Sequence, residues 1–223
     1  NGDGTDDVGV FRPGPQGTFL LRVPTIEWPC LLCPPRLIIN TRTIILGVAG
    51  DIPFAGDWNG DSWQDVILGS PGASNLEGVK SGYVRIAKGN TGGALATFYG
   101  QTEGELFGYQ ACVIDWDGDA ILDVAASAPS FKVNGVGVGR VDVRSGADGS
   151  TLASWTGIDA PGSFGHSLAR NGDVNGDGRD ALASGAPKSL GPGRVFVKLA
   201  GSGIEWFQLI GQDPTEMLGT AVA

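Results

Sequence analysis

Short apolar runs, each closed by a proline, recur along the chain at nearly equal distances. They are DVGVFRP, DVILGSP, DVAASAP and ALASGAP, at Asp7–Pro13, Asp65–Pro71, Asp123–Pro129 and Ala181–Pro187. A second set of strand-like runs starts at a glycine, at Gly82–Ala87, Gly139–Val143 and Gly193–Leu199. Short β-branched runs that end at Gly or Pro predict strands rather than helices.

Two further runs follow in each repeat. The third run lies at Ala94–Tyr99, Thr151–Trp155 and Ile204–Ile210, and the fourth at Leu106–Ile114, Ser163–Arg170 and Met217–Ala223. The 38 Gly and 13 Pro residues, and the lack of a long stripe with helical period, disfavour helices. Four strands per repeat predict an all-β fold, a β-propeller of four-stranded blades with about four blades in this chain.

An acidic loop precedes each proline-closed run. Its copies are Asp57–Asp65 (DWNGDSWQD), Asp115–Asp123 (DWDGDAILD), Asp173–Ala181 (DVNGDGRDA) and the shorter Asn1–Asp7 (NGDGTDD). Equivalent residues of successive copies are 58 positions apart, at Asn1, Asn59, Asp117 and Asn175. This period divides the chain into repeats of approximately 1–56, 57–114, 115–172 and 173–223.

The repeat resembles the FG-GAP repeat of integrin α-subunit propellers and their bacterial relatives. The resemblance rests on Phe107-Gly108, Phe164-Gly165 and the weaker Leu218-Gly219, together with Gly69-Ser70-Pro71, Ser127-Ala128-Pro129 and Gly185-Ala186-Pro187. It implies a propeller of about seven blades, so we expect the chain to be part of a larger ring. The alternative is a closed four-bladed ring, in which Met217–Ala223 supplies the strand that the opening blade lacks.

The first repeat departs from this pattern. Phe11-Arg12-Pro13 replaces the second half of the motif, and Gly50–Asn59 is similar to a bacterial variant of the calcium-loop propeller repeat. The segment Pro24–Thr43 fits neither pattern. It contains Cys30 and Cys33, which suit either a local disulfide or a pair of buried thiols.

The acidic loops predict calcium sites. Oxygen side chains stand at loop positions 1, 3, 5 and 9 around a glycine at position 4, and a carbonyl at position 7 is expected by analogy with other calcium loops. Several converging oxygens are what Ca²⁺ prefers, whereas zinc and copper favour His and Cys. The predicted ligands are Asn1, Asp3, Thr5, Asp7; Asp57, Asn59, Asp61, Trp63, Asp65; Asp115, Asp117, Asp119, Ile121, Asp123; and Asp173, Asn175, Asp177, Arg179.

The copies differ in completeness. The third loop has Ala181 at position 9, and its neighbour Asp180 is expected to point to the opposite face of the strand. An EF-hand is excluded because position 12 holds Leu68, Ala126 or Ser184 instead of glutamate. The simpler interpretation is that these Asp-Gly and Asn-Gly pairs only form hairpin turns.

Charge and composition narrow the function. The net charge is −9, and more than half of the 24 acidic residues lie in the four loops, so nucleic acid is not an expected partner. We expect no catalytic residues: His166 is the only histidine, and no G-x-S-x-G sequence occurs. Trp58 and Trp116 are expected to pack within blades rather than stack on sugars.

Two functions stay open. The resemblance implies a calcium-stabilised binding or adhesion module that recognises a protein or a glycan, with Pro24–Thr43, Ser74–Lys80 and Phe131–Gly137 as the segments free to vary. The alternative is a propeller domain of an extracellular enzyme such as a polysaccharide lyase or a phospholipase. Loops of modest calcium affinity fill only at extracellular concentrations, so we expect an extracellular or cell-surface location. No membrane span is evident in the sequence.

Overall fold

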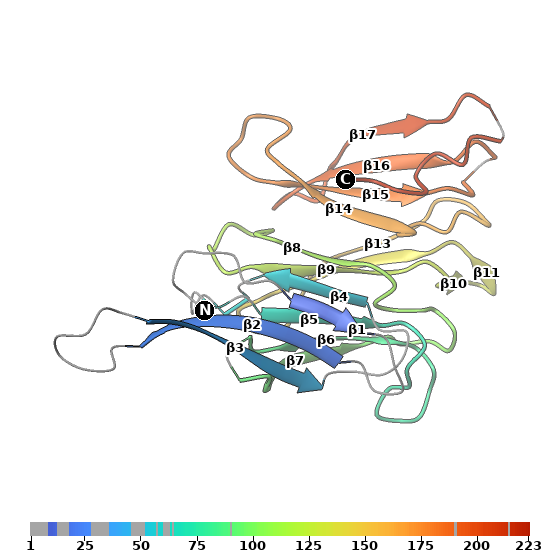
Figure 1. The fold of residues 1–223 in the computed structure, drawn as a ribbon. Coiled ribbons are helices and arrows are strands. Elements are labelled where there is room, and N and C mark those ends of the chain that lie inside the picture. The colour runs from blue at the N-terminus through green and yellow to red at the C-terminus, as the bar shows by residue number, and fades with distance from the viewer. Residues whose placement is uncertain are drawn as a thin grey trace.

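The computed structural model describes residues 9–12, 18–27, 36–45, 52–56, 58–59, 63, 65–89, 91–189, 191–213 and 215–223. Every regular element within these ranges is a β-strand, which confirms the predicted all-β class (Figure 1).

Three antiparallel sheets of four strands repeat the same meander. The first contains β4 (Ile52–Gly56), β5 (Asp65–Ser70), β6 (Tyr83–Ala87) and β7 (Ala94–Tyr99). The second contains β8 (Ala111–Ile114), β9 (Asp123–Ala128), β12 (Arg140–Arg144) and β13 (Thr151–Thr156), and the third β14 (Ser167–Asn171), β15 (Ala181–Ala186), β16 (Arg194–Leu199) and β17 (Glu205–Ile210). A small hairpin, β10 (Lys132–Val133) and β11 (Val136–Gly137), lies between β9 and β12. We call these three sheets the first, second and third blades.

The N-terminal sheet has three strands, β1 (Gly9–Arg12), β2 (Thr18–Glu27) and β3 (Arg36–Ile45). β2 and β3 pair along their whole length, from Thr18 opposite Ile45 to Glu27 opposite Arg36. The described parts of Pro24–Thr43, which the repeat pattern does not account for, therefore form a strand pair. Cys30 and Cys33 lie outside the described residues.

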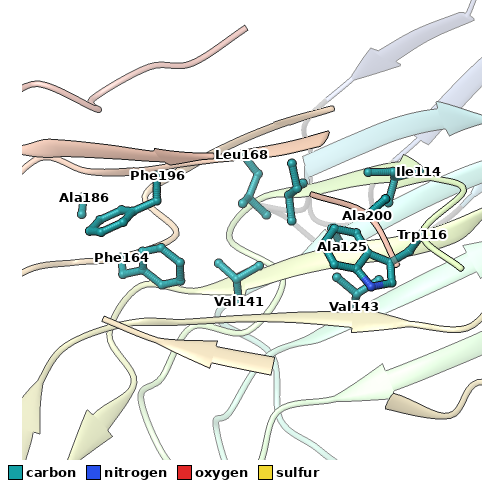
Figure 2. Packing of buried hydrophobic residues seen from close by; sticks show 11 residues of the cluster. Ile114, Trp116, Ala125, Val141, Val143, Phe164, Leu168, Ala186, Phe196 and Ala200 are labelled. Atoms are coloured by element: carbon teal, nitrogen blue, oxygen red, sulfur yellow. The ribbon is translucent and has the colours of Figure 1, made fainter. Parts of the chain in front are cut away.

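The blades follow one another in chain order (Figure 1), and two clusters of buried apolar side chains lie between successive blades. Strand β8 lies beside both β4 and β14, so the first strands of the three blades are neighbours. Figure 2 shows one core cluster, in which Val141 and Trp116 from the second blade meet Phe196 and Leu168 from the third. Face-to-face packing of four-stranded meanders is the propeller architecture that the sequence predicts.

The Phe-Gly turn connects each blade to the next. Gly108 has a φ of +86°, and a Cβ there would lie 2.5 Å from the Tyr83 carbonyl oxygen, so no other residue fits. The Gly108 N–H donates to the Ser127 carbonyl of the following blade, and the Gly165 N–H donates in the same way to Gly185. Because these turns occupy the start of the predicted fourth runs, β8 and β14 begin only at Ala111 and Ser167.

The prediction of a strand at Met217–Ala223 is not met, since only a single bridge from Leu218 to Gly193 forms there. The reason is that the first strand of a blade forms only by pairing with the second strand of that blade. β8 pairs with β9 and β14 pairs with β15, so the residues that follow each Phe-Gly turn become a strand by pairing with the next blade. The segment Met217–Ala223 has no such strand beside it within the described residues.

Candidate metal centre

The acidic loops join the first strand of each blade to the second. Asp57–Asp65 connects β4 to β5, Asp115–Asp123 connects β8 to β9, and Asp173–Ala181 connects β14 to β15. Because the blades repeat one topology, the three loops lie at the same end of their sheets. The segments Ser74–Lys80 and Phe131–Gly137 connect second to third strands and so lie at the opposite end.

The loop Asp115–Asp123 brings three carboxylates together. Asp115, Asp117 and Asp123 each offer an oxygen, and these oxygens lie within 4.8 Å of one another. The loop turns back on itself at Gly118 and Ala120, whose φ angles are +83° and +67°. Asp115 accepts hydrogen bonds from the N–H groups of both residues, at 2.8 and 3.2 Å, which fixes the turn. Converging carboxylates on a tight turn fit a hard cation such as Ca²⁺.

Asp123 is the buried member of this set, with 0% exposure. Its Oδ2 accepts the Trp116 N–H at 2.8 Å, and its Oδ1 accepts the Gly146 N–H, from the turn between β12 and β13, at 2.9 Å. Burial raises the pKa of the Asp123 carboxyl, these two hydrogen bonds oppose the rise, and the nearby Asp117 charge adds to it. A bound cation would favour the ionised form of this carboxylate.

The two remaining predicted ligands of this loop are not in the group of three. The Asp119 carboxylate accepts a hydrogen bond from the Ile121 N–H at 2.8 Å and lies on the exposed side of the loop. Ile121 is expected to supply its backbone carbonyl as a ligand, and its side chain is 38% exposed. Their roles as ligands stay predictions.

The loop Asp57–Asp65 has a buried carboxylate at its ninth position, as the loop Asp115–Asp123 has. Asp65 is 0% exposed, and its oxygens accept the N–H groups of Trp58 and Gly89, both at 3.1 Å. Trp58 and Gly89 occupy the places that Trp116 and Gly146 have in the next blade. Of the other predicted ligands here, Asn59 and Trp63 are described, whereas Asp57 and Asp61 lie outside the described residues.

The third loop has no carboxylate at its ninth position. Its backbone folds around its first aspartate, Asp173. Asp173 accepts N–H groups from the four loop residues Asn175, Gly176, Asp177 and Gly178, and these hydrogen bonds lower the pKa of its carboxyl. Asp177 accepts the Asn175 side-chain amide at 2.8 Å and the Arg179 N–H at 2.9 Å.

Asp180, the neighbour of Ala181, forms an ion pair with Arg170, and the expectation that it does not replace the missing ligand stays a prediction. The predicted ligands of the opening loop, Asn1, Asp3, Thr5 and Asp7, lie outside the described residues.

A cleft of about 420 Å³ separates the second and third loops. Its lining includes Asp115, Asp177 and the two arginines Arg170 and Arg179. The Arg179 guanidinium reaches the neighbouring loop, where a Cβ on Gly118 would lie 3.2 Å from its Cζ. The sequence predicts only that Arg179 supplies its backbone carbonyl as a calcium ligand. No local signal in the sequence indicates that the Arg179 side chain crosses to another blade.

Other residues singled out by the sequence have structural positions. Trp58 and Trp116 are 4% and 2% exposed, and they pack on Phe98 and Trp155, which confirms packing over sugar stacking. The His166 ring lies 5.4 Å from the Tyr109 ring in a tilted arrangement, and burial, with the Lys188 charge, lowers the pKa of its imidazole. Among the described residues, no helix is long and apolar enough to cross a membrane.

Comparison with known proteins shows that the chain is similar to integrin α-subunits. It is 34% identical to integrin alpha-PS2 of Drosophila melanogaster over 153 residues, which is 64% of this chain. It is 33% identical to integrin alpha-8 of Mus musculus and 29% identical to integrin alpha-V of Gallus gallus, over 60% and 59% of this chain. The matched regions span only 11–13% of these curated relatives. No family model matches the chain.

Proposed function

Because the chain belongs to the integrin α-like family of FG-GAP β-propellers, we propose that it is a calcium-stabilised, extracellular or cell-surface module that binds a protein or a glycan. The convergence of Asp115, Asp117 and Asp123 carries the calcium part of this proposal. The same chain segments build the blade and the loop, so the ion acts on the fold itself.

Calcium holds the end of each blade in one arrangement. The buried carboxylate at the ninth position already joins the loop to the turn between the third and fourth strands, through Trp116 and Gly146 in the second blade. A cation shared with Asp115 and Asp117 completes this connection and offsets repulsion among the three carboxylates. The role proposed for the ion is structural, and no catalytic role is assigned to any residue.

Recognition is assigned to the opposite end of the blades. There the β10–β11 hairpin turns at Asn134 and Gly135, with φ of +52° and +81°, and exposes Val133 and Val136 by 42% and 49%. In the first blade, Leu76 is 86% exposed on a turn that the Asn75 side chain holds by accepting two backbone N–H groups. Ordered turns that present apolar side chains to solvent are suited to partner binding.

Calorimetric titration with Ca²⁺, followed by thermal unfolding with and without a chelator, tests the metal site. At a hundredfold excess over Kd, one site stabilises the native state by about 2.7 kcal/mol. For a domain of this size, that raises Tm by roughly 5–11 °C. The double variant Asp115→Asn, Asp117→Asn should lose one ion and its share of the shift, whereas Asp148→Asn, on an exposed turn of the same blade, should lose neither.

Calcium uptake that is absent in the wild type, or unchanged in the double variant, contradicts the site. A glycan and extracellular-protein array then tests recognition. Replacing Lys132–Gly137 by a tight turn, or Leu76 by serine, should abolish partner binding and leave calcium uptake intact. Binding that depends only on the loop aspartates would contradict this assignment of the two ends.

A further inference from the structure

Arg194, the first residue of β16, is a buried cation that has no carboxylate partner. It is 9% exposed, its Nη1 donates to the Gln208 side-chain carbonyl at 3.0 Å, and its buried Nε has no acceptor. No ion pair in the described part of the chain includes it. Buried charges in proteins are normally paired, because an unpaired one loses its hydration without compensation. The position of Arg194 is therefore unfavourable unless an anion reaches it.

The second blade has an arginine at the same position. Arg140 begins β12 as Arg194 begins β16, and the strand registers place them opposite Ala128 and Ala186, the last residues of the second strands. Both arginines therefore lie at the end of the blades that is opposite to the acidic loops. Arg140 shows which groups surround this position when its charge is paired.

Two carboxylates pair with the Arg140 guanidinium. Glu105 of the first blade lies 3.2 Å from its Nη2, and Asp142 lies 3.3 Å from its Nε. Gln101 accepts a hydrogen bond from its Nη1 at 3.3 Å, and the Phe131 ring lies 4.3 Å from its Cζ. The charge of this buried arginine is therefore compensated on several sides.

The groups around Arg194 differ at all four of these positions. The turn Gly157–Gly165 (GIDAPGSFG) repeats Gly100–Gly108 (GQTEGELFG), and the strand registers and turn hydrogen bonds align the remaining residues. In place of Glu105, Asp142, Gln101 and Phe131 stand Gly162, Phe196, Ile158 and Ser189. None of the four replacements is charged, so the third blade keeps the arginine without its partners.

The turn Gly157–Gly165 contains one carboxylate, Asp159, which binds elsewhere. Its Oδ2 accepts the Ser189 hydroxyl at 2.8 Å, and it forms no ion pair with Arg194 among the described residues. A Cβ on Gly162 would lie 2.7 Å from Oδ1 of Asp159, so the turn leaves no room for a glutamate at this position. An anion for Arg194 has therefore to come from outside this interface.

A cleft of about 310 Å³ opens between the second and third blades on the side of β16 that carries Arg194. Ile158 and Phe196, two of the replacements, line it together with Lys198. Arg194, Phe196 and Lys198 share one face of β16, because side chains alternate along a strand. Figure 2 shows Phe196 against Phe164, which also lines the cleft, with the rings 5.3 Å apart. The cleft thus lies next to Arg194 and has apolar side chains where Arg140 has polar neighbours.

The shape of the cleft favours an extended peptide over a sugar. Its lining includes five consecutive residues, Ser154–Ile158, that follow the outermost strand of the second blade. Such an edge strand offers unpaired N–H and C=O groups to an added strand. The Trp155 ring is not free for a sugar to stack on, because Lys198 Nζ lies 5.7 Å from its centroid and a Cβ on Gly203 would lie 3.2 Å from the ring.

We propose that this cleft, with Arg194 at one end, binds an extended segment of a partner protein through an aspartate or glutamate side chain. The partner's carboxylate takes the place beside Arg194 that Glu105 has beside Arg140, and Ile158 and Phe196 receive its apolar neighbours. Glu205, which pairs with Lys198 at the other end of the cleft, disfavours a second acidic residue there. The site rests on the protein recognition proposed above, but it needs neither the β10–β11 hairpin nor calcium.

Thermal unfolding of the chain without a partner tests whether Arg194 is unpaired. Arg194→Met should leave Tm unchanged or raise it, because it removes a buried charge that nothing compensates. Arg140→Met should lower Tm by several degrees, because it leaves Glu105 and Asp142 buried without their cation. The proposal is overturned if Arg194→Met lowers Tm as much as Arg140→Met does or fails to fold, since Arg194 would then have a structural partner.

An array of immobilised short peptides tests the ligand. Each peptide has Asp, Glu, Asn or Gln at its centre and Val, Ile, Leu, Phe or Thr on either side. The 223-residue chain should bind the best acidic peptides roughly tenfold or more tightly than their amide counterparts, and Arg194→Gln should remove this preference. Lys132→Gln, at an exposed cation of the same end, should keep it. Asp159→Asn should strengthen binding of acidic peptides, because it removes a negative charge from the neighbouring turn.

The outcomes separate this site from the recognition proposed for the hairpin. Replacing Lys132–Gly137 by a tight turn should leave the preference for acidic peptides intact. If that replacement removes the preference and Arg194→Gln keeps it, the proposed function stands and this site is wrong. The site is also wrong if no acidic preference exists, if acetate alone competes as well as the peptides, or if a galacturonate oligomer binds in an Arg194-dependent way and acidic peptides do not.

Discussion

Truncation of Glu105 should show how much the buried ion pair between the first and second blades contributes to stability. The carboxylate accepts hydrogen bonds from the Gln101 N–H, the Thr102 hydroxyl at 2.8 Å and Arg140. Glu105→Ala removes the acceptor of all three hydrogen bonds and leaves the Arg140 charge buried. Breaking one partner of a buried pair costs about 3–5 kcal/mol. Arg140 keeps a second carboxylate, Asp142, 3.3 Å from its Nε, which places the expected loss near ~3 kcal/mol.

The assay is urea unfolding followed by tryptophan fluorescence, with Ca²⁺ held in constant excess. A loss of ~3 kcal/mol corresponds to a fall in Tm of roughly 6–12 °C for a domain of this size. Glu103→Ala is the matched control, because Glu103 is exposed on the same turn and should change stability by no more than about 0.5 kcal/mol.

Glu105→Leu combined with Arg140→Met should recover part of the loss, since it removes the unpaired charge together with its partner. If Glu105→Ala costs less than about 1 kcal/mol, or no more than Glu103→Ala, the pair does not hold these blades together.

Three further predictions concern single residues. Ala181→Asp should tighten calcium binding at the third loop by about tenfold or more, measured by calorimetry, because it restores at the ninth position the carboxylate that Asp123 supplies in the second blade. The pKa of His166 is lowered below its ordinary 6.5, so its contribution to stability is present above that value and is lost as pH falls through the folded-state pKa. The Tm of His166→Gln should therefore fall less between pH 7.5 and 5 than the Tm of the wild type. Parallel curves of Tm against pH would contradict this. Burial raises the pKa of the Cys112 thiol from 9.0 to about 12, so its alkylation at pH 8 should be roughly a thousandfold slower in the native protein than in urea, and equal rates would contradict the burial.

The repeat made most of the fold predictable. Strands β5, β6, β7, β9, β12, β13, β15, β16 and β17 lie where the apolar runs predicted them, within one or two residues. Each run is bounded by a glycine or proline that acts locally, as Gly108 does through its positive φ. The same phase identified the loop aspartates and the burial of Trp58 and Trp116, because equivalent positions in repeats have equivalent surroundings.

What the sequence by itself determined was therefore periodic and local: the all-β class, the four strands of a blade, the acidic turns and the integrin α-like repeat. Contacts between blades depended on the tertiary structure. Glu105 pairs with Arg140, the Arg179 side chain extends to Gly118, and the buried Asp123 carboxylate accepts the Gly146 N–H. Each of these contacts joins segments that no local pattern links. The failure of Met217–Ala223 to form a strand has the same physical reason, since a strand exists only beside a partner, and no partner strand lies beside this segment within the described residues.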